Sequence, residues 1–154
     1  MRQKLWHNLS EDALMALGRN LAEHLPQGGF AALIGALGAG KTVFVRGMAA
    51  GLGVRHLSSP TFTIVQEYDT APPLYHFDVY RLADVWELEA IGYADYLSRG
   101  ALVVMEWADL MPEALPSERL EVCVEGSGEV PRTLTLTAYG DAYEQIILNL
   151  ERNV

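Results

Sequence analysis

Eight residues in the first third of the chain have the types and the spacing that hold phosphate groups. Residues 35–42 read GALGAGKT and match the pattern G-x-x-x-x-G-K-[ST]. Three glycines let the backbone turn sharply and point its N–H groups inward, where they donate to phosphate oxygens. Lys41 then reaches the β- and γ-phosphates, and the Thr42 hydroxyl is a ligand for Mg²⁺. The stretch therefore predicts the binding of a nucleoside triphosphate. The three glycines are Gly35, Gly38 and Gly40.

The elements on either side of this loop occur in the order that a phosphate-binding loop requires. The apolar run Phe30–Ile34 predicts a buried strand directly before it, and a helix is predicted from about Lys41 to Leu52 directly after it. The positive end of the helix dipole then faces the bound anion. The alternative is a glycine-rich turn with a surface lysine, which requires neither the strand nor the helix.

Two carboxylates are candidates for holding the metal ion and orienting water. Glu106 follows a run of apolar residues that reads as a strand buried on both faces, and a metal-binding acid is expected at that position. Asp78 lies in a second strand-like run, where an unpaired carboxylate is costly to bury. The alternatives are a solvated strand end for Glu106, and an ion pair with Arg81 or a strand-end turn for Asp78. Trp107, beside Glu106, is interpreted as a core residue.

Features of two other nucleotide-binding classes are missing from the sequence. There is no N-K-x-D motif, which reads guanine in many GTP-binding proteins. There is also no arginine-rich segment of the kind that closes over the substrates of small-molecule kinases, because the basic residues after the loop are scattered singly. The sequence therefore favours a nucleotide hydrolase over a phosphotransferase.

The remaining pattern predicts an α/β fold of the phosphate-loop type. A helix is predicted over Ser10–Leu25, with Ser10 as its cap. The runs Phe62–Asp69 and Leu74–Tyr80 are expected to form an antiparallel hairpin. We expect one domain over residues 1–154, a three-layer sandwich with a mostly parallel central sheet and this hairpin. The other predicted elements are strands at Ala101–Trp107, Arg119–Glu125 and Thr133–Tyr139 and helices at Ala83–Ile91, Tyr93–Ser98 and Asp141–Leu150.

Charge and composition weigh against several functional classes. The chain has 20 acidic and 11 basic residues, a formal net charge of −9, and no basic stripe. Tight binding of nucleic acid by the chain alone is therefore not expected, and any RNA connection should run through a partner protein. No apolar run approaches the roughly 20 residues that cross a bilayer, and the single cysteine, Cys123, excludes a disulfide framework. We expect no membrane association and a cytoplasmic location.

Five blocks of the sequence together resemble one known family. They are GALGAGKT at 35–42, SSPTFTIVQEY at 58–68, YHFDVYRL at 75–82, WELEAIGYADYL at 86–97 and VVMEW at 103–107. In the order and spacing of these blocks the chain resembles the TsaE family, formerly YjeE, the bacterial ATPases involved in making threonylcarbamoyladenosine in tRNA. The resemblance is specific from about Phe30 to Trp107 and weak in the N-terminal helix and the C-terminal strands.

This resemblance implies a function as well as a fold. It implies a phosphate-loop α/β fold that binds ATP and Mg²⁺ and hydrolyses ATP slowly. It also implies association with the paired TsaB and TsaD subunits, which transfer the threonylcarbamoyl group to adenosine 37 of tRNAs reading codons that begin with A. In that scheme the ATP cycle resets the transferase complex between turnovers. The acidic chain suits such a role, because the partners can hold the tRNA.

The resemblance also assigns site residues by position. The stretch from Gly38 to Val43, which includes Ala39, resembles the phosphate cradle. Thr42 and Glu106 resemble the metal ligands, and Asp78 the second acid near the metal. Thr61 resembles a switch residue that reports the γ-phosphate, the alternative being a plain proline-containing loop. Three residues are candidates for the adenosine side: Ser10, Glu11 and Arg132, of which Arg132 is also explained as an exposed arginine at the start of a strand.

The chain departs from the family pattern at one position of the loop. The family usually carries an acid as the second loop residue, and here that residue is Ala36. Val43 likewise replaces a frequent second threonine. The backbone cradle does not need either side chain, so ATP binding should survive, while the hydrolysis rate and activation by partners are open to change. The rival functions are a small-molecule kinase of the same fold and a nucleotide-sensing adaptor that hardly hydrolyses ATP.

Overall fold

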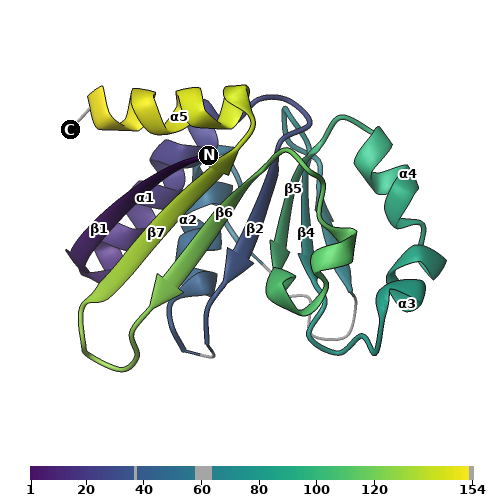
Figure 1. Cartoon of the computed structure of the whole chain (residues 1–154), viewed down its shortest axis with the longest axis horizontal. Helices are drawn as coiled ribbons and strands as arrows, with labels where there is room; N and C mark the ends of the chain where they lie inside the picture. The colour runs from purple at the N-terminus through teal and green to yellow at the C-terminus, as the bar shows by residue number, and fades with distance from the viewer. Residues whose placement is uncertain (37, 58–63, 153–154) are drawn as a thin grey trace.

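The sheet that forms the centre of the molecule has parallel strands in its middle and antiparallel strands at both edges. The computed structural model describes residues 1–36, 38–57 and 64–152. Within these residues the strand order is β1-β7-β6-β2-β5-β4-β3 (Figure 1). Strands β6, β2, β5 and β4 run parallel, β3 pairs antiparallel with β4, and β7 and β1 continue the sheet antiparallel beyond β6. The strands are β1 (Arg2–Leu9), β2 (Phe30–Ile34), β3 (Val65–Tyr68), β4 (Leu74–Asp78), β5 (Leu102–Glu106), β6 (Arg119–Glu125) and β7 (Arg132–Tyr139).

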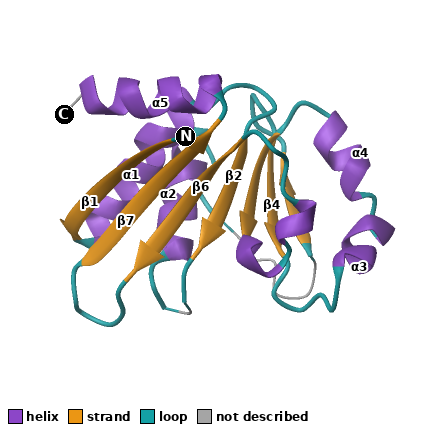
Figure 2. Ribbon diagram, in the orientation of Figure 1, coloured by secondary structure: helices purple, strands orange, loops and turns teal. Residues whose placement is uncertain are grey.

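Helices pack on both faces of this sheet, α1, α2 and α5 on one face and α3 and α4 on the other, where β6, β7 and β1 remain uncovered by the described residues (Figure 2). Successive strand residues point to opposite faces, so Ala31 and Leu33 of β2 pack with α1, α2 and α5, whereas Phe30 and Ala32 pack with α3 and α4. The predicted α/β fold with two helical layers around a mostly parallel centre is therefore confirmed. The helices are α1 (Glu11–His24), α2 (Lys41–Gly51), α3 (Val85–Ala90), α4 (Tyr93–Ser98) and α5 (Asp141–Arg152), with 3₁₀ turns η1 (Ala108–Leu110) and η2 (Pro112–Ala114).

The first helix forms for the local reasons that its sequence contains. Ser10 is its N-cap, and its hydroxyl oxygen accepts a hydrogen bond from the backbone N–H of Ala13 at 3.1 Å. Glu11 and Asp12 occupy the first turn, where the helix dipole favours acids. Among the described residues, no helix combines the length and the apolar character that crossing a membrane requires.

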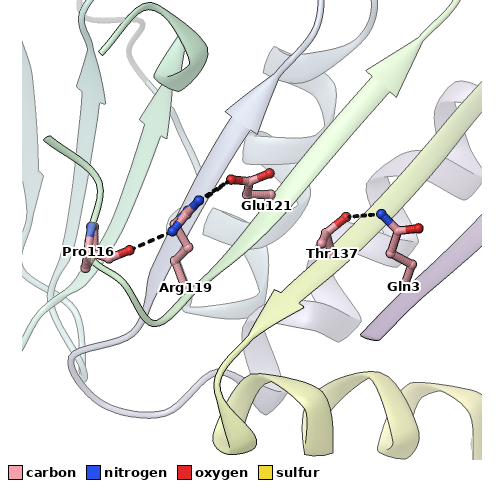
Figure 3. Close-up of polar contacts among 5 residues, drawn as sticks. All are labelled: Gln3, Pro116, Arg119, Glu121 and Thr137. Carbon is pink, nitrogen blue, oxygen red and sulfur yellow. Dashed lines mark hydrogen bonds and ion pairs between the residues drawn. The ribbon is translucent and has the colours of Figure 1, made fainter. Parts of the chain in front are cut away.

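The first strand is the element that the sequence pattern missed. Residues 2–9 read RQKLWHNL, and the strand lies at the edge of the sheet with most of its side chains exposed. It is held by pairing with β7, in a register that places Gln3 opposite Thr137. The Gln3 side-chain amide donates to the Thr137 hydroxyl at 3.1 Å (Figure 3). An edge strand of this kind depends on its neighbour rather than on an apolar pattern of its own.

Two predicted strands end earlier in the structure because the backbone turns at their carboxyl ends. β4 ends at Asp78 rather than Tyr80, and the Asp78 carboxylate accepts a hydrogen bond from the Tyr80 N–H at 3.0 Å. β5 ends at Glu106 because the next residue, Trp107, has a left-handed conformation with φ 61°. Both turns lie at the same edge of the sheet, and they point the two carboxylates toward the loop that follows β2.

Candidate active site at the phosphate-binding loop

A cavity of about 330 Å³ lies where β4 and β5 end and α2 begins. The loop and the first turn of α2 line it with Gly38, Gly40, Lys41, Thr42 and Val43. The rest of its wall comes from Glu11, Asp78, Glu106, Trp107 and Arg132. The structure thus brings together residues from five separate parts of the chain that the sequence proposed for one site, and it adds Trp107 to them.

At two of its glycines the loop combines a positive φ with a close approach to neighbouring elements. Gly40 has φ +107°, and a Cβ atom there would lie 2.8 Å from a methyl group of Leu14. Gly35 has φ +151°, and a Cβ atom there would lie 2.5 Å from the carbonyl oxygen of Val124. The glycines are therefore required by close approach to α1 and β6 as well as by the turn itself.

The start of α2 differs from the start of α1 in a way that favours an anion. Whereas α1 has a capping side chain and two acids in its first turn, α2 has neither a side-chain cap nor an acid there. Its N-cap, Gly40, has no side chain that bonds the first N–H groups. The positive end of the α2 dipole therefore faces the cavity without a capping side chain or an acid from the first turn of the helix itself.

Lys41 places a buried ammonium group at this cavity without a hydrogen-bonding partner. The side chain is 5% exposed, and Nζ has no partner among the described residues. It lies 3.2 Å from the centroid of the Trp107 ring, in a cation–π contact. Burial lowers the pKa of Lys41, and the opposing effects of Glu106, Asp109 and Asp78 do not cancel that shift. A buried donor of this kind is costly unless an acceptor enters the cavity.

Asp78 and Glu106 stand side by side at the ends of two neighbouring parallel strands. The register pairs Asp78 of β4 with Glu106 of β5. Burial raises the pKa of Asp78, and the nearby Glu106 raises it further, while the Tyr80 N–H, His76 and Lys41 act in the opposite direction. Asp78 both forms the strand-end turn and lines the cavity, because the hydrogen bond from the Tyr80 N–H engages only Oδ1 of its carboxylate.

These two carboxylates do not form a complete metal site by themselves. In the part of the chain that the structure describes, no group of three or more His, Cys, Asp or Glu residues is arranged to hold a metal ion. Mg²⁺ takes near-octahedral oxygen ligands and is commonly held by one or two carboxylates together with substrate phosphates and waters. The Thr42 hydroxyl and the two carboxylates fit that incomplete, substrate-dependent kind of site.

His76 is a member of this site that the sequence reasoning missed. It lies on β4 two residues before Asp78, and its Nε2 is 2.6 Å from Oε2 of Glu106. Both side chains are buried, at 1% and 5% exposed. The sequence could have indicated His76, because it lies two residues before Asp78 and residues i and i+2 of a strand point to the same face.

Arg132 is buried, contrary to the interpretation of an exposed arginine at the start of a strand. It is 7% exposed, and its guanidinium donates to the carbonyl oxygens of Ala39 at 2.8 Å, Gly38 at 3.3 Å and Gly128 at 3.0 Å, and also to that of Val130. It therefore ties the phosphate-binding loop to the loop between β6 and β7. A carbonyl oxygen cannot neutralise a cation, so the guanidinium also adds positive charge beside the cavity.

Three predicted site residues that the structure describes, Gly35, Ala39 and Ser10, do not line this cavity. A Cβ atom on Gly35 would meet the Val124 carbonyl oxygen of β6, and the Ala39 side chain packs in the core, so neither faces the cavity. Ser10 lines a neighbouring cavity of about 390 Å³ formed with residues 128–132, which shares Glu11 and Arg132 with the first. The Ser10 hydroxyl is already engaged as the cap of α1. Thr61 falls outside the described residues.

Trp107 and Asp109 also act on the site without having been predicted for it. Trp107 packs against the core on one side, as expected, but its ring also covers the Lys41 ammonium and contacts Tyr80 with ring centroids 4.7 Å apart. Asp109 lies in η1 and raises the pKa of Lys41. Trp107 reaches the cavity through the turn after β5, whereas Asp109 does not line the cavity and acts on Lys41 through its charge.

Comparison with known proteins gives one consistent result. The family model described as Threonylcarbamoyl adenosine biosynthesis protein TsaE matches residues 9–134. The chain is 41% identical over 155 residues to the tRNA threonylcarbamoyladenosine biosynthesis protein TsaE of Bacillus subtilis, covering 99% of this chain and 97% of that protein. It is 40% identical over 115 residues to the protein of the same name from Haemophilus influenzae, covering 68% of this chain and 73% of that protein. A crystal structure of Bacillus subtilis YdiB superposes with a TM-score of 0.84 at 36% identity, over 99% of this chain and 96% of that one.

Proposed function

We propose a function from the premise that this chain belongs to the TsaE family of threonylcarbamoyl adenosine biosynthesis proteins. In this proposal it binds ATP together with Mg²⁺ at the loop between β2 and α2 and hydrolyses ATP slowly to ADP and phosphate. Its place in tRNA modification is to act with a TsaB–TsaD type complex that modifies adenosine 37 of tRNAs reading codons that begin with A.

The observation that carries the proposal is the buried Lys41 ammonium with no partner at the wall of a cavity. A triphosphate supplies the acceptors that this donor lacks, and the uncapped start of α2 supplies backbone N–H groups for the same anion. In binding, the Lys41 ammonium moves from the Trp107 ring to the phosphate oxygens. The neighbouring cavity beside Ser10 and Glu11 is then available for the adenosine end of the nucleotide.

The metal is proposed to bind with the nucleotide rather than before it. Thr42, Asp78 and Glu106 would hold Mg²⁺, which supplies neutralisation of phosphate charge when bound. The chain's own contribution is positional. Thr42 fixes one oxygen at the start of α2, and the paired strand ends fix the two carboxylates opposite it.

In the hydrolytic step the groups of the cavity would act on a nucleotide whose charge Mg²⁺ partly neutralises. A water molecule attacks the γ-phosphorus, the bond from phosphorus to the oxygen shared with the β-phosphate breaks, and ADP and phosphate leave while the proton of the water passes to phosphate or solvent. Lys41 and the N–H groups of the loop stabilise the charge on the phosphate oxygens. A carboxylate of the site, Asp78 or Glu106, orients the water. The usual acid at position 36 is missing, which suits a slow reaction.

A partner complex is part of the proposal because the chain carries a net charge of −9. A chain that binds tRNA directly needs basic residues to neutralise phosphates. The family name refers to tRNA modification, so the acidic chain is proposed to reach the reaction through proteins that hold the tRNA themselves.

The proposal is tested by calorimetry and phosphate release on the purified chain. We expect heat of binding with ATP and Mg²⁺, free phosphate as the product, and faster release when TsaB, TsaD and tRNA are added. The Lys41→Met variant should lose the binding. No heat from well-folded protein with ATP and Mg²⁺ would refute the proposal, and phosphate found on an acceptor metabolite would indicate a kinase instead.

A second candidate function is favoured by one residue. With Ala36 in place of the family's acid, the chain keeps the backbone cradle and loses one carboxylate of the loop. A nucleotide-sensing adaptor would bind ATP and the partner proteins normally and hardly hydrolyse. Single-turnover hydrolysis with and without the partners separates the two, and the Ala36→Asp variant should raise the rate if the missing acid limits it.

A further inference from the structure

The histidine beneath the site has no role in the function proposed above, although it is bonded to one of the two carboxylates proposed to hold the metal. His76 lies on β4 between Tyr75 and Phe77, whose side chains pack on the opposite face of the sheet. His76 and Asp78 point to the same face, toward α2, with His76 one step further from the strand end. His76 is almost completely buried, at 1% exposed, so it is placed behind the cavity wall rather than in it.

Its Nε2 atom is bonded to Glu106 across the two strands. The distance from Nε2 to Oε2 of Glu106 is 2.6 Å, which is short for a hydrogen bond from nitrogen to a carboxylate oxygen. We assign the proton of this bond to Nε2, with the carboxylate oxygen as the acceptor. The other ring nitrogen, Nδ1, has no partner within the described residues. The ring is therefore held toward Glu106 by this one bond and by packing.

Glu106 needs such a partner because of where it lies. Its carboxylate is 5% exposed and stands beside a second carboxylate, that of Asp78, whose pKa it raises. The nearby Lys41 ammonium has no hydrogen-bonding partner and rests on Trp107, so it does not hold Glu106 by a direct bond. The bond from His76 engages Oε2 and leaves the second oxygen of Glu106 out of this contact.

We propose that His76 is a positioning residue that fixes one oxygen of Glu106 from behind, so that the other oxygen is presented to the metal ion and water of the nucleotide cavity. This inference rests on the proposed function, because it gives the His76–Glu106 pair a purpose only if a metal–nucleotide complex binds there. Partners in this position commonly change metal affinity or activity by about 10- to 100-fold when they are removed.

The test compares three replacements of the histidine that differ in where they carry a donor. In His76→Gln the amide nitrogen lies close to the position of Nε2, in His76→Asn it lies close to that of Nδ1, and His76→Leu has no donor. ATP binding is measured by calorimetry over a series of Mg²⁺ concentrations. We expect His76→Leu and His76→Asn to raise the Mg²⁺ concentration needed by about tenfold, and His76→Gln to restore most of the difference.

A matched control separates positioning from general loss of stability. Phe77→Leu makes a cavity on the same strand but on the opposite face, so it should lower the free energy of unfolding and leave the Mg²⁺ dependence as in the wild type. ATP binding without metal should be the same in all variants. If Phe77→Leu shifts the Mg²⁺ dependence as much as His76→Leu does, the positioning role is overturned.

A second readout uses the wild-type fold and needs no ligand. Long-range ¹H–¹⁵N spectra of the histidine rings should show His76 protonated at Nε2, and Glu106→Gln should move that resonance while leaving the other three histidines unchanged. An unmoved resonance overturns the inference, and so does an unchanged Mg²⁺ dependence in His76→Leu while the wild type binds ATP with Mg²⁺. A wild type that binds no ATP with Mg²⁺ overturns the proposed function together with this inference.

Discussion

Two polar side chains in the antiparallel half of the sheet, Arg119 and Glu121, have hydrogen-bonding partners, whereas a buried polar side chain at the cavity where the parallel strands end has none among the described residues. On the open face of β6 and β7, Arg119 donates to Glu121 at 2.7 and 3.0 Å and to the carbonyl oxygen of Pro116 at 3.0 Å (Figure 3). Its guanidinium also stacks 4.4 Å from the ring centroid of Tyr139. At the cavity, by contrast, the buried Lys41 Nζ has no partner.

This contrast indicates which half of the sheet is organised for stability and which for a ligand. Buried polar groups in folded proteins are nearly always hydrogen-bonded, so an exception needs an explanation. Both exceptions among the described residues, Lys41 Nζ and His76 Nδ1, belong to the same site. Arg119 and Glu121 in the antiparallel half already bond each other, whereas the site keeps bonding capacity that a ligand can use.

The largest expected effect comes from removing the buried ammonium. Lys41→Met should lower ATP affinity by roughly 100-fold, because the charged donor to the phosphates is lost. In the absence of nucleotide it should raise the free energy of unfolding by about 1 kcal/mol, since a buried group without a partner is replaced by an apolar one of similar length. Calorimetry and urea unfolding measure the two quantities.

The same variant carries a pH signature whose sign follows from the lowered pKa of Lys41. Between the folded and unfolded pKa values the unfolded chain binds more protons, so wild-type stability should rise with pH there. The cost of the ammonium is fully present below the folded pKa and is relieved as the pH rises from that value toward the unfolded pKa. The advantage of Lys41→Met should therefore shrink toward alkaline pH, and an advantage that grew with pH would contradict the burial argument.

Local sequence patterns predicted the parts of the fold that depend on short stretches of chain. Phe30–Ile34 is a strand as predicted, because a continuous apolar run bounded by glycines forms a buried strand. The N-terminal strand was missed because an edge strand with exposed side chains has no such run. Its existence depends on pairing with β7, more than 120 residues away, as the contact between Gln3 and Thr137 shows.

The candidate site was predictable where the chemistry lies in one motif and not where it depends on the fold. Lys41 and Thr42 follow from the loop pattern, and Glu106 from its place at the end of an apolar run. The contact of Trp107 with Lys41 requires the left-handed turn after β5, which no spacing signals. The burial of Arg132 depends on two loops that meet only in three dimensions.

The second largest effect on ATP affinity is expected from replacing Arg132, which joins the phosphate-binding loop to the loop between β6 and β7. Arg132→Met should leave the carbonyl oxygens of Gly38, Ala39 and Gly128 without this donor and lower the free energy of unfolding by roughly 2–3 kcal/mol. ATP affinity should also fall, because the phosphate-binding loop loses its anchor. Arg132→Lys should restore only part of either quantity, since an ammonium cannot reach several carbonyls in a planar fork. Full restoration by lysine would show that charge alone matters.

A smaller effect with a distinct pH dependence is expected at the paired carboxylates. Asp78→Asn keeps an oxygen acceptor for the Tyr80 N–H and removes the charge that lies beside Glu106. Without nucleotide or metal, we expect the variant to be more stable than the wild type at pH 7 by roughly 0.5–1 kcal/mol.

The sign follows from the raised pKa of Asp78. The folded wild type binds more protons than the unfolded chain at pH values between 3.8 and the folded pKa, so its stability falls as the pH rises through that range. His76 and Lys41 oppose the shift but do not reverse it. The gain from Asp78→Asn should therefore disappear when the pH is lowered below 3.8. Urea unfolding at several pH values measures it, and a constant gain would show that charge is not the cause.

The smallest effect is expected in the antiparallel half, and it sharpens the comparison because it should leave the site untouched. Arg119→Met removes the bonds to Glu121 and Pro116 while keeping an apolar stem beside Tyr139. Because both charged groups are only about one-fifth exposed, at 19% and 20%, we expect a loss of roughly 0.5–1 kcal/mol in unfolding free energy, partly screened by salt. ATP affinity should remain within about twofold of the wild type, since the pair lies outside the cavity wall. A fall in affinity comparable to that of Lys41→Met would mean that the two regions are coupled and that the division of roles between them is wrong.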